Sequence, residues 1–509
     1  MTTGMLSRSR STTLAGTTVR WMSTAASAEA VAETGAVKKS GGGGNMRLYQ
    51  RLSALGKKEG LVASTINKYI REGKKVHKEE LNCCVRELRR FGRHRQALEI
   101  MEWIDTRKMA LSSTDLATRL DLISKVHGVG AAEKYFNDLV PQQKNKYTYG
   151  ALLNCYCVEK MKDEALALFD RMGELKIEST SLAFSNLMSL HMRLGEFEKV
   201  NTLVEEMKKR EVPLSTFSYN IWMTSSSHLG DIQGVERVFE EIKQEGESKC
   251  DWTTYSNLAV AYVRAGLKEK AELALKMLEQ RMKPPKREAF HYLLSIYASI
   301  YNSDEVHRIW KSLKLSFRAT TNVSYLNMVR ALSKLNDIDG LKKLFEEWEL
   351  TCSSYDMRLA NAAIGAYLRN GLVDEAETIL RNVQERSNGP FGNAWELLMI
   401  FYLENRDLQN AFRCLEGATH DHNDSGWQPG SDSINKFLNC IEEGKDVDSA
   451  EVLFKLLKKV HCLKRNVYKS LLKTYIGAGR MEPNMRERIE GDGIEIDREL
   501  ESLLNVCCK

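Results

Sequence analysis

The residues best suited to chemistry in this chain are cations clustered near the N-terminus. Residues 45–111 contain 16 Lys and Arg against 8 Asp and Glu, whereas the net charge of all 509 residues is only +6. Such clustering favours contact with the phosphate backbone of a nucleic acid, which binds charge without reading sequence. A solvated basic helix face is the alternative interpretation. The candidate phosphate-binding residues are Lys74, Lys75, Arg86, Arg89, Arg90, Arg93 and Arg95.

The other reactive residue types form no catalytic or metal-binding pattern. Eleven cysteines are scattered without a Cys-x-x-Cys pair, and His420 and His422 lie in a stretch of loop composition without a nearby thiol. A zinc deaminase would need a His-x-Glu motif together with such a cysteine pair. We therefore expect no enzyme activity, metal site, cofactor or small-molecule substrate. No uncharged apolar run approaches the roughly 18 residues that a membrane span needs, so no span is predicted.

A repeated unit of two helices must position these side chains. Small apolar residues recur at spacings of 35, 33, 35, 35, 36, 35, 35, 35, 35 and 39 residues. They are Ala97, Ala132, Ala165, Val200, Val235, Ala271, Val306, Leu341, Ala376, Ala411 and Ala450. In a typical unit, Gly371 can end the first helix in a left-handed conformation, and Asp374 and Glu375 suit the start of the second. The regular spacing predicts an all-α fold, a right-handed α-solenoid of about twelve helical hairpins.

The repeat resembles the pentatricopeptide repeat. Its units carry Tyr-Asn/Ser/Thr-x-Leu, then Gly-x-hydrophobic-x-x-Ala, then Phe-x-x-Met. A tetratricopeptide array would repeat every 34 residues and carry a Trp-Leu-Gly-Tyr pattern that is missing here. The resemblance covers about four-fifths of the chain. The predicted repeats are 78–112, 113–145, 146–180, 181–215, 216–251, 252–286, 287–321, 322–356, 357–391, 392–430 and 431–464, with a partial one from Arg465.

This resemblance implies binding of single-stranded organellar RNA, with the fifth and last residues of each repeat reading one base. The polar candidates at these positions are Asn82 with Ser112, Ser185 with Ser215, Asn220 with Asp251, and Asn361. Only Asn220 with Asp251 matches a strong pair, of the kind that the family uses for uracil. Ala117, Gly150 and Leu326 occupy fifth positions and cannot make the contact. A long sequence-specific site is therefore disfavoured, and ordinary solvated helix positions remain the alternative interpretation.

The N-terminal residues have the composition of an organellar targeting sequence. Arg8, Arg10 and Arg20 stand among many Ser and Thr before the first acid, Glu29. The sequence RWMST resembles a plant mitochondrial cleavage pattern with a cut before Ser23. We predict a mitochondrial transit peptide at 1–22, a flexible linker at 23–45, a basic helical cap at 46–77, the solenoid at 78–480 and an acidic cap at 481–509. The predicted location is the mitochondrial matrix.

Segments beyond the repeat motif extend the resemblance. LYQRLSALGKKEG (48–60), RQALEIMEWIDTRKM (95–109) and NMRERIE (484–490) are similar to a pentatricopeptide protein of the large subunit of the land-plant mitochondrial ribosome. This implies a non-catalytic scaffold that contacts ribosomal RNA and mitochondrial ribosomal proteins. Two alternatives remain open. One is a sequence-selective RNA-binding factor for transcript stability, processing or translation, and the other is a protein scaffold that contacts no RNA. The basic segment argues against the second alternative.

Overall fold

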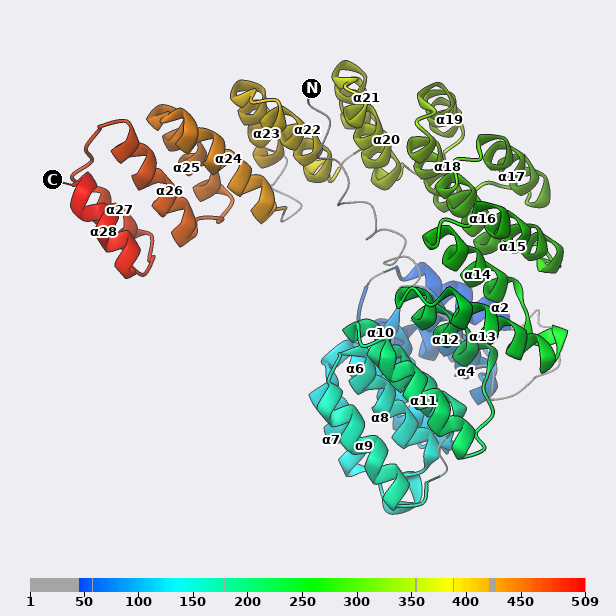
Figure 1. Ribbon diagram of the computed structural model, residues 1–509. Coiled ribbons are helices and arrows are strands. Elements are labelled where there is room, and N and C mark those ends of the chain that lie inside the picture. The colour runs from blue at the N-terminus through cyan, green and yellow to red at the C-terminus, as the bar shows by residue number, and fades with distance from the viewer. Residues whose placement is uncertain are drawn as a thin grey trace. The chain divides into compact units, whose positions relative to one another are not determined.

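The chain is helical throughout the part that the computed structural model describes (Figure 1). The described residues are 45–56, 58–177, 180–352, 355–387, 389–420 and 427–508. Within these ranges the chain forms 27 α-helices, two short 3-10 helices (Pro141–Gln143 and Glu247–Lys249) and no strand. The predicted transit peptide at 1–22, the linker up to residue 44, and His422 lie outside the described residues.

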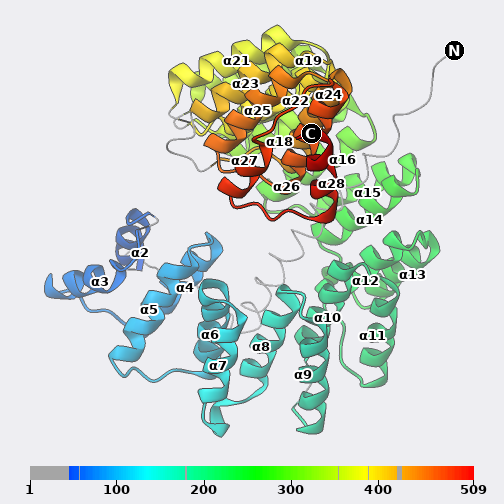
Figure 2. The same cartoon turned by 90° about the vertical axis from the view of Figure 1, so that its left-hand side faces the viewer.

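The helices pair into hairpins, and Figure 2 shows those of the N-terminal half standing side by side. The first helices are α4 (Lys78–Arg90), α6 (Ser113–His127), α8 (Lys146–Val158), α10 (Ser181–Leu194), α12 (Thr216–His228), α14 (Trp252–Arg264), α16 (Arg287–Ser299), α18 (Asn322–Leu335), α20 (Met357–Arg369), α22 (Gly392–Glu404), α24 (Ser431–Gly444) and α26 (Arg465–Gly477). The second helices are α5 (His94–Thr106), α7 (Val129–Asp138), α9 (Lys162–Glu174), α11 (Glu198–Lys209), α13 (Ile232–Gln244), α15 (Lys268–Arg281), α17 (Ser303–Ser316), α19 (Ile338–Thr351), α21 (Val373–Arg386), α23 (Leu408–His420), α25 (Val447–Lys459) and α27 (Met485–Gly491). Every first helix begins at the residue at which the sequence predicts a repeat to begin.

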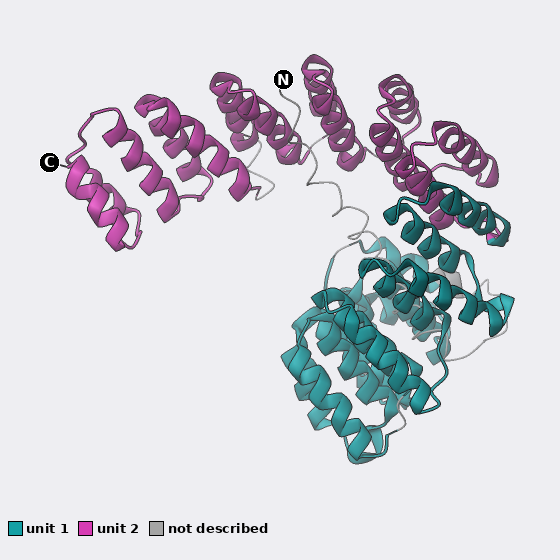
Figure 3. Ribbon diagram, in the orientation of Figure 1, with its two compact units in different colours: residues 1–281 teal, residues 282–509 magenta. Residues whose placement is uncertain are grey.

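The hairpins form two compact units, residues 1–281 and 282–509 (Figure 3). In the first unit, α2 (Asn45–Ala54) and α3 (Val62–Arg71) pack against the first hairpin through Leu48 and Ile66, both fully buried. In the second unit, α28 (Arg498–Cys507) packs against α26. Each unit is an α-solenoid in which a hairpin contacts chiefly its neighbours.

The recurring small residues form the core of the hairpins. Ten of the eleven have 0% exposure, and Ala450 has 6%. Each hairpin therefore needs an apolar side chain at this position, which explains why the spacing is maintained. Gly371 has a φ of +72°, and its N–H bonds to the carbonyl of Leu368, so the predicted left-handed end of the first helix is confirmed.

Candidate nucleic-acid interface

The last residue of a repeat is the N-cap of the next first helix. The Ser112 hydroxyl accepts a hydrogen bond from the backbone N–H of Asp115 at 3.2 Å, and Ser215 accepts one from Ser218 at 3.1 Å. The first N–H groups of a helix have no partner within it, so short polar side chains at this position stabilise the start of the helix. Asp251 does the same for α14 through one carboxylate oxygen. These predicted base-reading residues therefore have a structural role as well.

The fifth residue of several repeats bonds to the next first helix. Ser185 is 1% exposed and Asn220 is 4% exposed, so both are buried between neighbouring helices. The pairs are Asn82 Nδ2 to Asp115 Oδ1 at 3.1 Å, Ser185 Oγ with Ser218 Oγ at 2.9 Å, Asn220 Nδ2 to Thr253 Oγ1 at 3.0 Å, and His291 Nε2 with Ser324 Oγ at 2.9 Å. In each pair the partner lies 33 residues later, so the contact repeats with the fold.

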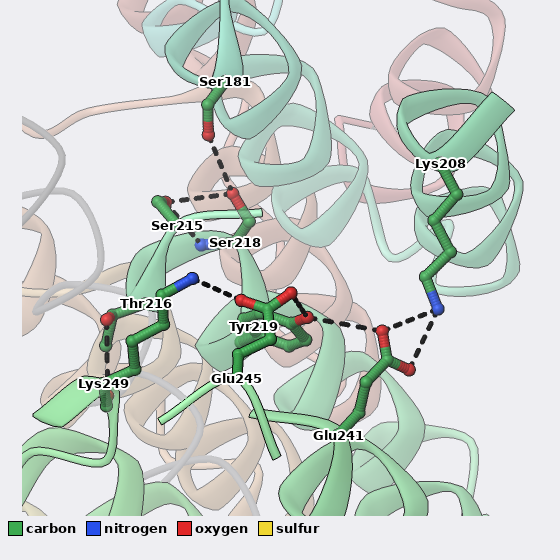
Figure 4. A network of polar contacts seen from close by, with 9 residues as sticks. All are labelled: Ser181, Lys208, Ser215, Thr216, Ser218, Tyr219, Glu241, Glu245 and Lys249. Atoms are coloured by element: carbon green, nitrogen blue, oxygen red, sulfur yellow. Dashed lines mark hydrogen bonds and ion pairs between the residues drawn. The ribbon is translucent and has the colours of Figure 1, made fainter. Parts of the chain in front are cut away.

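Figure 4 shows how these contacts extend around α12. Ser218 contacts Ser215 of its own cap and Ser181 of the preceding first helix. On the adjoining side, the Tyr219 hydroxyl donates to Glu245 at 2.7 Å, which joins α12 to the end of its own hairpin. Burial and the neighbouring carboxylates Glu245 and Glu241 raise the pKa of Tyr219, so the phenol stays protonated. The polar network fixes the orientation of the helix before any ligand binds.

Two of the predicted base-reading residues retain an acceptor atom that has no partner. Asn220 Oδ1 and Asn361 Oδ1 are buried and accept no hydrogen bond in the described part of the chain. The Ser256 hydroxyl, at the fifth position of the repeat after Asn220, is in the same condition. A buried polar atom without a partner costs free energy that a donor from a ligand would recover.

Four of the seven predicted phosphate-binding cations contact the protein itself. The Arg89 guanidinium pairs with Asp121 at 2.8 Å, and Arg93 donates to the carbonyl of Ser53 at 2.6 Å. The remaining two pairs are Lys74 with Glu72 at 3.0 Å and Arg95 with Glu59 at 3.7 Å. Although burial opposes it, the cations Lys125 and Arg89 hold the pKa of Asp121 below its ordinary value. Arg89 and Arg93 thus stabilise the fold.

Three predicted cations remain available to a ligand. Lys75, Arg86 and Arg90 are exposed and form no ion pair with a described residue. Arg90 also belongs to a row that sequence reasoning missed. The thirteenth residue of successive repeats in the first unit is Lys, Arg or His in five of six cases, namely Arg90, Lys125, Arg193, His228 and Arg264. Burial lowers the pKa of His228 to about 4, so only the other four are charged at neutral pH. The signal that could have found this row is its spacing of about 35 residues.

Two arginines of this row have no carboxylate partner within the described residues. Arg193 donates to the carbonyl of Cys157 at 3.0 Å, and neither Arg193 nor Arg264 forms an ion pair within the described residues. Burial lowers the pKa of both guanidiniums, because the surrounding protein replaces part of their water. Arginine still remains charged at any physiological pH. A partly desolvated, unpaired cation favours an anion such as a phosphate.

The same position changes sign within the second unit. Lys334 and Arg369 are basic, and both reach the preceding first helix, with Lys334 Nζ 2.7 Å from Ser299 Oγ and Arg369 2.5 Å from Ser333 Oγ. The equivalent residues of the next two repeats are Glu404 and Glu443. In this region the Glu396 carboxylate accepts hydrogen bonds from the backbone N–H of Gly430 and from the hydroxyl of Ser433. In the second unit, the basic residues at the thirteenth position therefore lie on α18 and α20.

No group of three or more His, Cys, Asp or Glu side chains within the described ranges could hold a metal ion. None of the described helices is both long enough and apolar enough to cross a membrane.

Comparison with known proteins gives consistent similarities. The model of the pentatricopeptide repeat matches residues 147–177, 182–212, 217–247, 323–350 and 359–387. A mitochondrial pentatricopeptide repeat-containing protein of Arabidopsis thaliana is 45% identical, over 91% of this chain and 86% of the relative. The large ribosomal subunit protein mL101 (rPPR4) of A. thaliana is 37% identical, over 90% of this chain and 94% of the relative. The crystal structure of maize PPR10 aligns with a TM-score of 0.43 and 16% identity, over 91% of this chain and 70% of PPR10.

Proposed function

The chain belongs to the pentatricopeptide repeat family, and from this premise we propose that it is a non-catalytic RNA- and protein-binding scaffold of the mitochondrial large ribosomal subunit. The observation that carries the proposal is the contrast between the two sets of candidate residues. The base-reading set is largely engaged in caps and contacts between helices, as Ser112 and Ser185 illustrate. The cations Arg193 and Arg264 form no ion pair with any residue that the structure describes. Such a surface binds RNA by charge and shape more than by sequence.

The ribosomal assignment is supported by the relative named as a large ribosomal subunit protein, which this chain matches along almost its whole length. The names of other relatives include a mitochondrial location, and this supports import through the predicted transit peptide at 1–22 into the matrix. Ribosomal RNA is the RNA partner that we propose, and mitochondrial ribosomal proteins are the proposed protein partners. The helical caps at 46–77 and 481–509 would then be the ends available to neighbouring proteins.

A sequence-selective RNA-binding factor is the second candidate function. It is favoured by the unpartnered acceptors Asn220 Oδ1 and Asn361 Oδ1, which are placed where the family reads bases. Asn220 is accompanied by Asp251, the strongest pair in the sequence.

Sedimentation of a mitochondrial lysate distinguishes the ribosomal scaffold from the sequence-selective RNA-binding factor. An epitope-tagged full chain should migrate with the large ribosomal subunit in a sucrose gradient and stay there after a high-salt wash. An Arg193→Gln, Arg264→Gln double variant should shift toward light fractions at a lower salt concentration than the unmodified chain. If the unmodified chain is found only in light fractions and moves after ribonuclease treatment, the ribosomal proposal fails and the sequence-selective factor is favoured.

A further inference from the structure

An exposed aromatic side chain lies among the basic residues of the first hairpin. Phe91 follows the last residue of α4 and is 64% exposed. It is the one phenylalanine among the large apolar side chains that are exposed in the described ranges. The equivalent residues after α14 and α20 are Ala265 and Asn370, which have no ring. The repeat itself therefore does not require an aromatic residue at this position.

The turn that holds Phe91 is fixed by hydrogen bonds on both sides. The N–H of Arg93 bonds to the carbonyl of Leu88 at 2.8 Å, with Gly92 at a φ of +71° between them. The Arg93 side chain bonds to the carbonyl of Ser53, and Gln96 Nε2 bonds to that of Gly56 at 2.5 Å. These contacts attach the turn and the start of α5 to the end of α2 and to the segment that follows it. The Phe91 ring is thus held outward on a rigid backbone.

Two arginines near Phe91 in the sequence form no ion pair with a described residue. Arg86 and Arg90 are four residues apart, so they share one face of α4. Both are exposed, and neither pairs with a carboxylate of the described chain. Arg89, which lies between them in the sequence, is turned to Asp121 and is not available. The surface near the end of α4 therefore combines one aromatic face with two unpaired cations.

We propose that Phe91 stacks on an unpaired base of RNA while Arg86 and Arg90 contact the adjoining phosphates. This inference rests on the proposed RNA-binding function, and it adds a contact outside the fifth and last positions of the repeats. Every base has a π face, so stacking on an aromatic ring is tolerant of sequence. A site for a protein partner would favour an apolar surround, whereas the surround of Phe91 is basic. An unpaired base in a loop of structured RNA fits both the ring and the charges.

Binding of the full chain to two RNA probes tests the inference. One probe is a stem-loop with an unpaired uridine loop, and the other is a fully paired duplex of the same length. The variants are Phe91→Leu, Phe91→Trp and the double variant Arg86→Gln, Arg90→Gln. Leu315→Ala is the matched control, because Leu315 is 88% exposed on α17 in the second unit. Thermal unfolding of each variant confirms that the fold is retained.

Phe91→Leu should weaken stem-loop binding about tenfold and leave duplex binding and the salt slope unchanged, since only stacking is lost. Phe91→Trp should retain or exceed the affinity of the unmodified chain for the stem-loop. The arginine double variant should weaken both probes and reduce the salt slope by about two. If Phe91→Leu binds the stem-loop as the unmodified chain does, the stacking inference is wrong while RNA binding stands. If the unmodified chain binds neither probe, both the inference and the proposed function fail.

Discussion

The side-chain amide of Asn220 donates a hydrogen bond to the hydroxyl of Thr253, 3.0 Å away on the next first helix. Thr253 is held in turn by Asp251, whose carboxylate accepts from the backbone N–H and the hydroxyl of Thr253. The two residues predicted to read one base are therefore connected through Thr253. These hydrogen bonds fix their orientation without RNA. The same contacts join α12 to α14, which makes their structural and recognition roles inseparable in a simple alanine variant.

Substitutions at Asp251 can separate these roles. Asp251→Ala removes the N-cap of α14 and should lower the free energy of unfolding by about 1 kcal/mol. Asp251→Asn keeps a good N-cap and should stay within a few tenths of the original stability. Urea denaturation followed by circular dichroism measures both. Equal stability of the Ala and Asn variants would contradict the capping role, and a change in RNA preference with Asn alone would show base reading.

Arg264 and Arg89 are expected to respond differently to the same substitution. Arg264→Gln removes an unpaired cation, so it should weaken binding to every RNA sequence and reduce the salt slope by about one. Arg89→Gln breaks the pair with Asp121 and should instead lower the free energy of unfolding by roughly 1–3 kcal/mol. Titration of a fluorescent RNA at several salt concentrations, together with urea denaturation, distinguishes the two outcomes. A normal stability and a reduced salt slope for Arg89→Gln would show that Arg89 binds phosphate after all.

The helical repeat was predictable because its signal is apolar and strictly spaced. Ala97, Ala271 and Ala376 are buried in equivalent positions, and the residue before each first helix is commonly a capping type such as Ser215 or Asp251. Local helix signals and core packing therefore predict the same helical hairpins along the chain. The division near residue 281 was not predictable, because the spacing from Ala271 to Val306 is still 35 residues.

The candidate site was harder to predict than the fold. Nothing local distinguishes Arg89, which pairs with Asp121, from Arg86, which does not, because the partner lies 32 residues away on α6. The exposure of Phe91 depends on the same tertiary packing. The row that includes Arg193 could have been found by aligning the thirteenth residues of the repeats. Its cations carry no apolar periodicity, which is the signal that located the helices.

His291 predicts a pH dependence of the stability of the second unit. Burial lowers the pKa of His291 to about 4, and its ring bonds to Ser324 at 2.9 Å. In the unfolded chain histidine takes up a proton near pH 6.5, whereas the folded His291 does so only near pH 4. Stability is therefore lost as the pH falls through this window, by roughly 2 kcal/mol between pH 7 and pH 5.

Urea denaturation at pH 7 and pH 5 measures this loss. His291→Gln cannot titrate and should show a smaller loss of stability than the unmodified chain. His420→Gln is the control, because His420 is exposed at the end of α23. An identical pH dependence in the unmodified chain and in His291→Gln would exclude His291 as the source.

Substitution of Trp348 tests how far a local loss of stability extends along the solenoid. This side chain is 1% exposed on α19, donates from Nε1 to Asn322 at 2.9 Å, and lies 4.8 Å from the Tyr355 ring between centroids. Trp348→Ala should cost about 3–5 kcal/mol locally, because the cavity cannot be filled by rigid neighbouring helices. A hairpin contacts chiefly its neighbours, so hydrogen exchange should accelerate in α18, α19 and α20 and remain unchanged in the first unit. Trp348→Phe retains most of the volume and should show a smaller effect in the same segments. Faster exchange spread evenly from α4 to α26 would instead mean that the two units unfold as one cooperative body, and the nearest-neighbour description of the array would be wrong.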